Sequence, residues 1–356
     1  MNNGIEYPFW AWTVFFVIIF TALIVDLGIA NRRAHAPSRR ETYIWSAVWI
    51  SLALGFNGFI YWMVNDHFEN HQLALVKTKE YFTGYLIELS LSVDNLFVFL
   101  LIFSYFKVPK EYQHRVLFWG IFGALVMRMA MIFAGAELVE RFHWIIYVFG
   151  AFLVYTGIKM LREQDDDFEP ENSALVRLVT RFVRISKHYE GEKFIVKKDG
   201  RRIGTLLLLV LIVIEVSDLI FAVDSIPAIF GITTDRFIVY TSNVFAILGL
   251  RTFFFLLLNV VEKFHYLKYG LAFILTFIGI KMLLPLLAEA ALWSRIIGAE
   301  SPTSHFLHDF LAKKYNDQLI TISLSVVVVT LILSVVLSLV FPAEQSEPAA
   351  ENHFPE

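Results

Sequence analysis

The 356-residue sequence contains no cysteine and few charged residues. Without cysteine it has no disulfides, no thiolate metal site and no cysteine nucleophile, and the redox compartment stays undetermined. Any bound metal must therefore be held by oxygen or imidazole. A net charge of −3 gives no indication of a nucleic-acid partner. Only 18% of the residues are charged, whereas 57% are hydrophobic and the mean hydropathy is +0.61. This composition is too apolar for an ordinary soluble protein and favours a polytopic membrane protein.

Nine apolar runs are long enough to cross roughly 30 Å of hydrocarbon. They fall at about 9–30, 43–64, 81–106, 115–136, 144–161, 204–229, 236–258, 266–286 and 319–341. The N-terminus has no basic n-region, so we interpret the first run as a retained span and not as a cleaved signal peptide. The predicted fold is an all-α protein with about nine transmembrane helices, the first two of which lie within residues 1–80.

The distribution of Lys and Arg predicts the orientation of these spans. If the connection after the first span is cytoplasmic, 20 basic residues lie on the cytoplasmic side and 8 on the other side. Arg128 and Arg251 lie within spans. Eleven of the 20 fall between Lys159 and Arg202. We therefore expect the N-terminus outside and the C-terminus in the cytoplasm.

Three connecting or terminal segments have distinct compositions. Residues 162–203 form the basic cytoplasmic loop, in which we predict an acidic hinge at 164–172, an interfacial helix at 173–189 and a hairpin turning at Asp199 and Gly200. The external loop 287–318 carries His305, His308 and Asp309, and we favour a polar linker helix over a metal site there. Residues 342–356 form an acidic tail, which we expect to be disordered.

Acidic residues interrupt the third and sixth runs, where hydrocarbon side chains are expected. An ionisable side chain at bilayer depth is costly and usually lines a bundle interior, an ion path or a proton relay. Aligning "SVDN" with "AVDS" places Asp94 opposite Asp224 and, six residues earlier, Glu88 opposite Asp218. The five acids are Glu88, Asp94, Glu215, Asp218 and Asp224.

The similarity of these two runs extends to the spans that follow them. Residues 139–161 match residues 261–283, and Arg128 matches Arg251. Each repeat thus holds three spans, at 81–161 and 204–286. Because three is odd and no span lies between the repeats, the second copy must run opposite to the first. This is the inverted-topology repeat that is characteristic of transporters.

The inversion predicts how deep each acid lies. An outer layer should pair Glu88 with Asp224, and an inner layer should pair Asp94 with Asp218, with Glu215 below. Acids six residues apart differ by about 120° in azimuth on a straight helix, so the layers are either separate sites or carried by unwound helices. Pro227 favours unwinding in the sixth span because it frees the carbonyl of Val223.

Several polar residues accompany the acids in the predicted site. The alternative to an ion site is a structural network of the acids with Arg128 and Arg251, which would leave three carboxylates unpaired. We expect both arginines to be counterions. Asp26 is expected at the interface, and Asn57 and Asn243 to form helix–helix hydrogen bonds. The amide of Asn95 is a further predicted ligand, and the supporting residues are Ser90, Ser92, Ser217, Ser225, Arg128 and Arg251.

Three motifs resemble the TerC family, particularly its Alx-like members: "YFTGYLIELSLSVDNLFVF", "LIVIEVSDLIFAVDSIPAIF" and "TSNVFAILGLR". The resemblance covers nearly the whole chain except the acidic tail and parts of the outer loop. It implies a multi-pass inner-membrane protein of metal homeostasis that exports manganese(II), with tellurium resistance as the source of the name. The family's intramembrane acids map onto the five acids of this sequence.

Oxygen ligands without thiolate suit Mn²⁺, Mg²⁺ or Ca²⁺, and the sequence does not choose among them. We expect a secondary transporter, not an enzyme, in which such an ion is the transported species and not a tightly bound cofactor. Proton coupling and the protein partners stay open. One alternative is a metal-binding scaffold of a stress or tellurium-resistance response. Another is an intramembrane aspartic protease, against which the missing GxGD signature and the number of acids argue.

Overall fold

The computed structural model describes residues 6–28, 39–162, 185–186, 189–198, 201–257, 266–293, 302–311 and 315–341. Within these ranges, the side chains of Asp26, Asp94, Arg251 and His305 are among those that lie outside the description. Nearly all of the described chain is helical. The helices are α1 (Phe9–Gly28), α2 (Arg39–Phe68), α3 (His71–Tyr105), α4 (Lys110–Arg141), α5 (Ile145–Arg162), α7 (Leu206–Phe230), α8 (Arg236–Leu248), α9 (Leu250–Leu257), α10 (Leu267–Trp293), α11 (Pro302–Leu311) and α12 (Asn316–Val340).

Each predicted apolar run is helical where it is described, with one correction. The run at 236–258 is not one helix, because it divides at Gly249 into α8 and α9. Glycine has a low helix propensity, and here the Phe253 ring packs where a Cβ at position 249 would lie. The low helix propensity of Gly249 and the close packing of Phe253 therefore both contribute to the break between α8 and α9.

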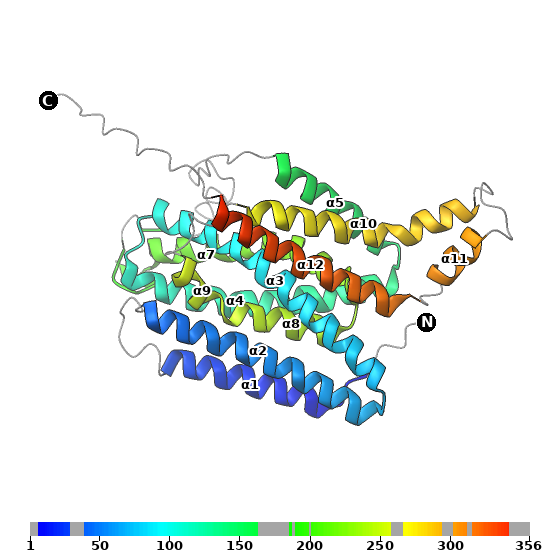
Figure 1. Cartoon of the computed structure of the whole chain (residues 1–356). Coiled ribbons are helices and arrows are strands. Elements are labelled where there is room, and N and C mark those ends of the chain that lie inside the picture. The colour runs from blue at the N-terminus through cyan, green and yellow to red at the C-terminus, as the bar shows by residue number, and fades with distance from the viewer. Residues whose placement is uncertain are drawn as a thin grey trace.

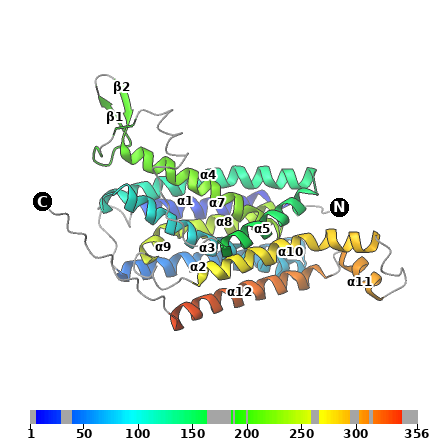
Figure 2. The same ribbon diagram turned by 90° about the horizontal axis from the view of Figure 1, so that it is seen from above.

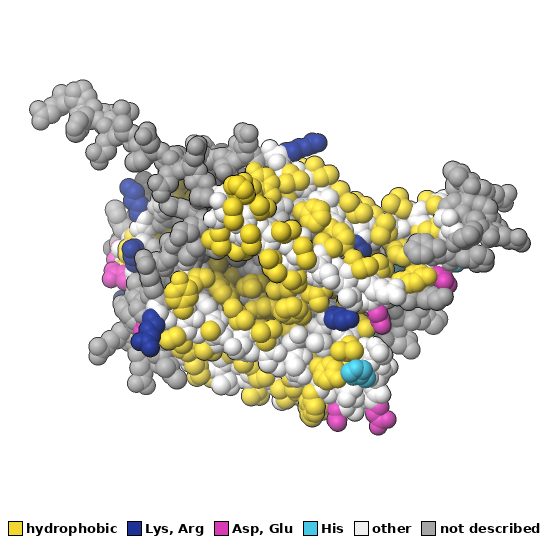
Figure 3. Space-filling model, in the orientation of Figure 1, with side chains coloured by type: hydrophobic (Ala, Val, Ile, Leu, Met, Phe, Trp, Pro, Cys, Tyr) yellow, Lys and Arg dark blue, Asp and Glu magenta, His cyan; other side chains and the backbone are white. Residues whose placement is uncertain are grey.

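Six described helices are long and apolar enough to cross a membrane, namely α2, α4, α5, α7, α10 and α12. Helices α1 and α8 are apolar but shorter, and α3 carries the acids of the first repeat. Hydrophobic side chains cover most of the face seen in Figure 3 between the two ends of the bundle. The protein is thus a polytopic helical membrane protein, while the total of nine spans stays a prediction.

The loop at 162–203, predicted to be cytoplasmic, is described only in part. The predicted hairpin is present: β1 (Ile195–Lys198) pairs antiparallel with β2 (Arg201–Gly204), with Lys198 opposite Arg201. The predicted interfacial helix cannot extend to residue 189, because Ile185 forms a β-bridge with Gly204. Residues 164–172, 173–184 and 342–356 lie outside the described part of the chain. A helix, α11, lies in the loop at 287–318, where a linker helix was predicted.

The hairpin and α11 lie at opposite ends of the helical bundle (Figure 2). Helix α1 starts at the end that carries α11, and α12 finishes at the other end (Figure 1). We call the end with the start of α1 the N-terminal end. This arrangement agrees with an orientation in which the two loops face opposite sides of the membrane, although the side that each faces stays a prediction.

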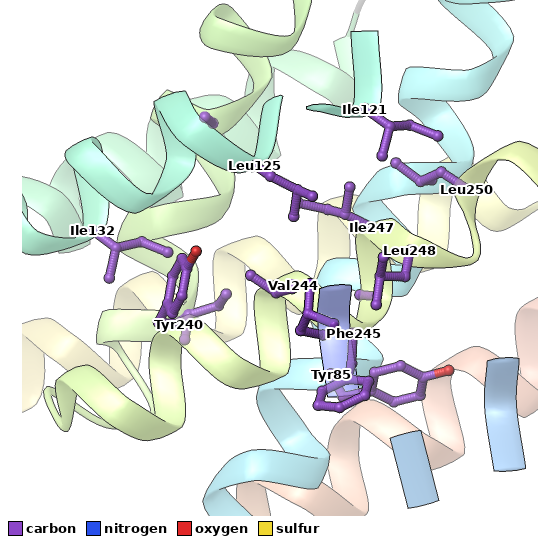
Figure 4. Close-up of a cluster of buried hydrophobic side chains, with 14 of the residues drawn as sticks. Tyr85, Ile121, Leu125, Ile132, Tyr240, Val244, Phe245, Ile247, Leu248 and Leu250 are labelled. Atoms are coloured by element: carbon purple, nitrogen blue, oxygen red, sulfur yellow. The ribbon is translucent and has the colours of Figure 1, made fainter. Parts of the chain in front are cut away.

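Helix α8 lies at the centre of the core. Every residue from Phe237 to Leu248 is buried. Side chains of α3, α4 and α9 pack around α8 in Figure 4, including Tyr85, Leu125 and Leu250. The polar residues Thr241, Ser242 and Asn243 share this buried environment at 0% exposure. A polar segment is thereby held in the middle of the bundle.

The predicted repeats, α3 to α5 and α7 to α10, pack against each other reciprocally. Helix α3 packs on α8, α4 on α7, and α5 on α10. If α3, α4 and α5 are exchanged with their counterparts α7, α8 and α10, the same three pairs of helices remain in contact. The α5–α10 pair is especially close, because a Cβ at Gly279 would lie 2.6 Å from the Gly150 carbonyl oxygen.

Candidate functional site

Arg128, in the middle of α4, is completely buried and binds two of the predicted acids. Its Nη1 donates to a Glu88 carboxylate oxygen on α3. Its Nη2 and Nε donate to the two carboxylate oxygens of Asp218 on α7, at 3.0 and 3.2 Å. This is the two-pronged geometry by which a guanidinium binds a carboxylate most strongly. One cation therefore joins three helices.

Two neutral side chains complete this cluster. The Asn243 Nδ2 on α8 donates to Glu88 Oε2 at 2.9 Å, and the Ser225 Oγ on α7 accepts from Arg128 Nη1 at 3.3 Å. Asn243 thus forms the helix–helix bond expected of it, whereas the Asn57 Oδ1 is buried without a partner. We call Glu88, Arg128, Asp218, Ser225 and Asn243 the central cluster. Its charges are two carboxylates against one guanidinium.

Glu215 lies next to the central cluster, three residues before Asp218 on α7. Its carboxylate interacts electrostatically with Asp218, and its Oε2 is buried without a hydrogen-bond partner. The carboxylate rests against Gly123 of α4, where any Cβ would overlap it. A buried polar atom without a partner is costly, and here it belongs to an acid. Glu215 therefore adds a third carboxylate next to Asp218, while the central cluster contains one arginine.

Asp224 faces a different direction from Asp218. Its carboxylate interacts with the Thr156 hydroxyl and the Lys159 ammonium of α5. Helix α7 continues from Leu206 to Phe230 through Pro227, so the predicted unwinding at this proline is wrong. A continuous helix keeps the azimuthal difference of about 120° between residues six apart. Asp218 and Asp224 are therefore separate.

The predicted outer layer of Glu88 with Asp224 is also wrong. Glu88 is bonded to Arg128 and Asn243, and it shares Arg128 with Asp218. Depth along α3 and α7 predicted the layers, but Arg128 of α4, which packs on α7, reaches both Glu88 and Asp218. The acids that the repeat alignment makes equivalent, Glu88 and Asp218, are thus the pair that meets.

The remaining predicted site residues are more dispersed. Ser90 and Ser217 donate to backbone carbonyls one turn earlier, at 2.6 and 2.8 Å. The Ser92 Oγ and Asn95 Nδ2, which flank Asp94 on α3, are buried without partners. The side chains of Asp94 and Arg251 lie outside the description, so their expected contacts stay predictions. Among the described side chains, no three of Asp, Glu and His are placed to hold one metal ion.

Sequence reasoning missed two parts of this site. Asn243 was expected only to join helices, and Gly123 was not singled out. The "TSN" triplet inside an apolar run was the available signal for Asn243. Gly123 gave no signal of its own, because its importance lies in the Glu215 side chain that packs over it.

A model of the TerC family of integral membrane proteins matches residues 74–346, which include every residue of the central cluster. The chain belongs to the TerC family. This TerC chain is 50% identical over 274 residues to the "Putative membrane-bound redox modulator Alx" of Escherichia coli K12, covering 77% of the chain and 85% of that relative. The protein of the same name from Salmonella typhi gives the same identity and coverage.

Another relative of the TerC chain carries a less specific name. The "Uncharacterized membrane protein STKORF319" of Myxococcus xanthus is 48% identical over 271 residues, covering 76% of the chain and 82% of that protein. No solved structure matches the chain significantly. The relatives agree on a membrane location, and the central cluster is the feature from which a function can be argued.

Proposed function

We propose that this TerC protein is a secondary transporter that exports a divalent metal ion, Mn²⁺ first among the candidates, through the central cluster. The observation that carries the proposal is the charge balance around Arg128. Glu88 and Asp218 share one fully buried cation, while Glu215, whose carboxylate interacts with Asp218, has one carboxylate oxygen without a hydrogen-bond partner. Unpaired carboxylates are expensive in a low-dielectric interior, and a divalent cation would balance them.

Arg128 suggests how such an ion would be exchanged. The guanidinium holds Glu88 and Asp218 together, and so occupies the position between two carboxylates that a metal ion would take. In the mechanism that we propose, the arriving ion takes over these carboxylates and Arg128 swings aside. Ser225 and Asn243 contribute hydroxyl and amide oxygens, which together with carboxylates suit Mn²⁺, Mg²⁺ or Ca²⁺.

The packing of the two repeats supports alternating access. In an inverted repeat, one set of helices can adopt the arrangement of the other, which exposes a central site to each side in turn. The reciprocal pairing of α3 with α8 and of α4 with α7 is what such an exchange requires. Export would then carry the ion from the hairpin end, expected to be cytoplasmic, to the N-terminal end.

The test is metal flux in proteoliposomes with the variants E88Q, D218N and E215Q, measured together with thermal stability. Losing a charged ligand should slow Mn²⁺ flux at least about tenfold, the lower limit for losing a group that only supports a metal ligand. E215Q should fold at least as well as the parent, because it removes an unbalanced charge. E137Q is the matched control, since Glu137 is an exposed acid on α4.

Parallel measurements with and without a pH gradient would reveal proton coupling. Normal flux together with reduced stability in E88Q and D218N would contradict the proposal. It would show that these acids hold the bundle together and do not carry an ion.

The name of the Alx relatives points to a second candidate, an effect on redox balance. A chain without cysteine offers no thiol–disulfide couple of its own. In our proposal such an effect would be indirect, through the metal that is transported or bound by a scaffold. Full biological activity without metal flux would favour the scaffold.

The geometry does not favour an intramembrane aspartic protease that uses Asp218 and Asp224. These residues face different helices and have different partners. A protease dyad needs two aspartates that share one proton. Cleavage assays with membrane-embedded substrates would test this alternative directly.

A further inference from the structure

A second group of buried charges lies where α1, α3 and the α7–α8 turn meet at the N-terminal end. The Lys77 Nζ on α3 lies 2.9 Å from Glu80 Oε2 and 2.9 Å from Asp235 Oδ2. The Thr233 hydroxyl donates to Glu80 Oε2, and the Tyr7 hydroxyl donates to Asp235 Oδ2, both at 2.8 Å. The three charged side chains are no more than 11% exposed. We call these five residues the N-terminal latch.

The two oxygens of Asp235 have different partners. Oδ1 caps α8 by accepting from the backbone N–H groups of Phe237 and Ile238, at 3.1 and 3.3 Å. Oδ2 accepts from Lys77 and Tyr7. Capping α8 requires only Oδ1. The bonds of Oδ2 tie the start of α1 and the α3 helix to the α7–α8 turn.

The N-terminal latch is aligned with the central cluster along two helices. On α3, Glu80 of the latch precedes Glu88 of the cluster by eight residues, and on α8, Asp235 precedes Asn243 by eight. Eight residues of helix rise about 12 Å. The same two helices, packed side by side, therefore carry both groups at the same separation.

The stretch between these groups is closed in this conformation. Gly84 of α3 and Ser242 of α8 are both buried, and a Cβ at Gly84 would lie 2.8 Å from the Ser242 Oγ. An ion that leaves the central cluster between α3 and α8 towards the N-terminal end would part the two helices at this contact. Parting them there also pulls Lys77 away from Asp235.

We propose that the N-terminal latch is the gate that closes the N-terminal end of the ion path, and that release of Lys77 from Asp235 opens it. This inference rests on the proposed transport function. Ion pairs suit a gate, because the two charges become hydrated when they separate on opening. The closed and open states therefore stay close in free energy. Buried apolar packing offers no such compensation.

Other groups around the latch fit a closed state. Burial, followed by the negative charge of Asp235, raises the pKa of Tyr7 well above its usual value, so its hydroxyl stays protonated and can donate. The Tyr7 ring also stacks on Phe237, with centroids 4.4 Å apart. Lys281 of α10 interacts electrostatically with Glu80, so a second lysine lies near the latch.

The test measures access to the contact below the latch. S242C supplies one thiol in this cysteine-free chain, and its labelling by a membrane-impermeant reagent is timed in vesicles of both orientations. D235N keeps an oxygen to cap α8 but loses the charge that holds Lys77, K77M removes the ammonium, and Y7F removes one hydroxyl but keeps the ring. K79M is the matched control, since Lys79 lies on the same turn and bonds Thr321 instead.

We expect D235N and K77M to speed labelling by about ten- to a hundredfold from the N-terminal side, the effect of losing a charge-assisted hydrogen bond. Y7F should give a smaller increase and K79M none. Unchanged labelling in variants that keep the parent's chromatographic profile would overturn the gate, as would equal acceleration by K79M. If K77M misfolds, D235N and Y7F decide the question. Labelling needs no metal, so a failed gate is distinguishable from failed transport.

Discussion

At the scale of single residues, Arg128 is a cation that two carboxylates share in a site from which water is excluded. In the proposed mechanism, the guanidinium and a divalent ion would compete for the same acids, and the ion would bring twice the charge. Replacement of Arg128 by the ion would then become more favourable as the number of nearby carboxylates increases. Glu215, with its unpartnered oxygen beside Asp218, adds to that tendency.

R128A should be strongly destabilised, because it leaves Glu88 and Asp218 without their shared partner. Removing one member of a buried ion pair commonly costs about 3–5 kcal/mol. If a metal ion can replace the guanidinium, added Mn²⁺ should restore more thermal stability to R128A than it adds to the parent protein. The measurement is thermal unfolding in detergent across a series of Mn²⁺ concentrations.

R141A is the control for this experiment. Arg141 pairs with Glu137 on the same helix, but its side chain is 70% exposed. Such surface pairs contribute about 0–1 kcal/mol. Equal losses in R128A and R141A, or no response of R128A to Mn²⁺, would count against a shared role for the arginine and the ion.

The sequence singled out the acids inside the apolar runs, but it did not predict which of them share a partner. Glu88, Asp218 and Glu215 stood out because charge is rare in an apolar run. Their partners could not be predicted in the same way, because the depth of an acid along α3 or α7 does not show which residue of α4 lies beside it. Arg128 was recognised as a counterion, but only packing shows that it serves Glu88 and Asp218 together.

At the scale of helices, α5 and α10 approach closely enough for their backbones to touch. Gly279 faces the Gly150 carbonyl oxygen at 2.6 Å and the Val154 nitrogen at 2.8 Å, measured from where its Cβ would lie. Small residues permit this kind of contact between membrane helices, where no hydrophobic force drives association. The third helices of the two repeats are therefore joined directly.

G279A should destabilise the protein by about 1–3 kcal/mol, as overpacking does when backbone cannot move away. G55A is the matched control on another membrane helix, because a Cβ at Gly55 meets nothing within 4 Å. It should be neutral or stabilising by about 0.4–1 kcal/mol. The two melting temperatures check this directly, and a similar shift for both variants would contradict the close crossing.

Hydropathy predicted where helices are but not where they begin and end. Helix α3 starts at His71, ten residues before its predicted run, because Asn70 caps it by accepting from the Leu73 backbone N–H. Lys77 and Glu80 therefore lie on a helix and not in a connection. The early turns were missed because charged residues there lower hydropathy without preventing helix formation. The N-terminal latch went unrecognised for the same reason.

At the scale of the whole molecule, the bundle has two distinct ends. The hairpin lies at one end and α11 at the other (Figure 2). The predicted second repeat places three spans between these two loops, so the repeat model predicts that the loops face opposite sides of the membrane. This prediction can be tested without any measurement of transport.

Cysteine labelling should place G191C in the cytoplasm and S301C outside, since the chain offers no competing thiol. Gly191 lies just before the hairpin, has a φ of 60° and meets nothing within 4 Å of its Cβ position. A glycine in that conformation accepts another residue with some strain, so E192C provides a second reporter on the same loop. Labelling of both loops from the same side would break the repeat model.

Helix α8 has a consequence for how the protein is made. It has 13 residues, so its length of about 20 Å falls short of the hydrocarbon thickness, and its residues from Phe237 to Leu248 are covered by other helices. Such a segment gains little by partitioning alone into lipid during synthesis. We expect it to stay beside the insertion machinery until α2, α3 and α4, which pack on it, can enclose it. We therefore expect biogenesis of this protein to depend on the order in which these neighbours leave the translocon, and substitutions in the Thr241–Ser242–Asn243 triplet to affect assembly as well as the proposed transport.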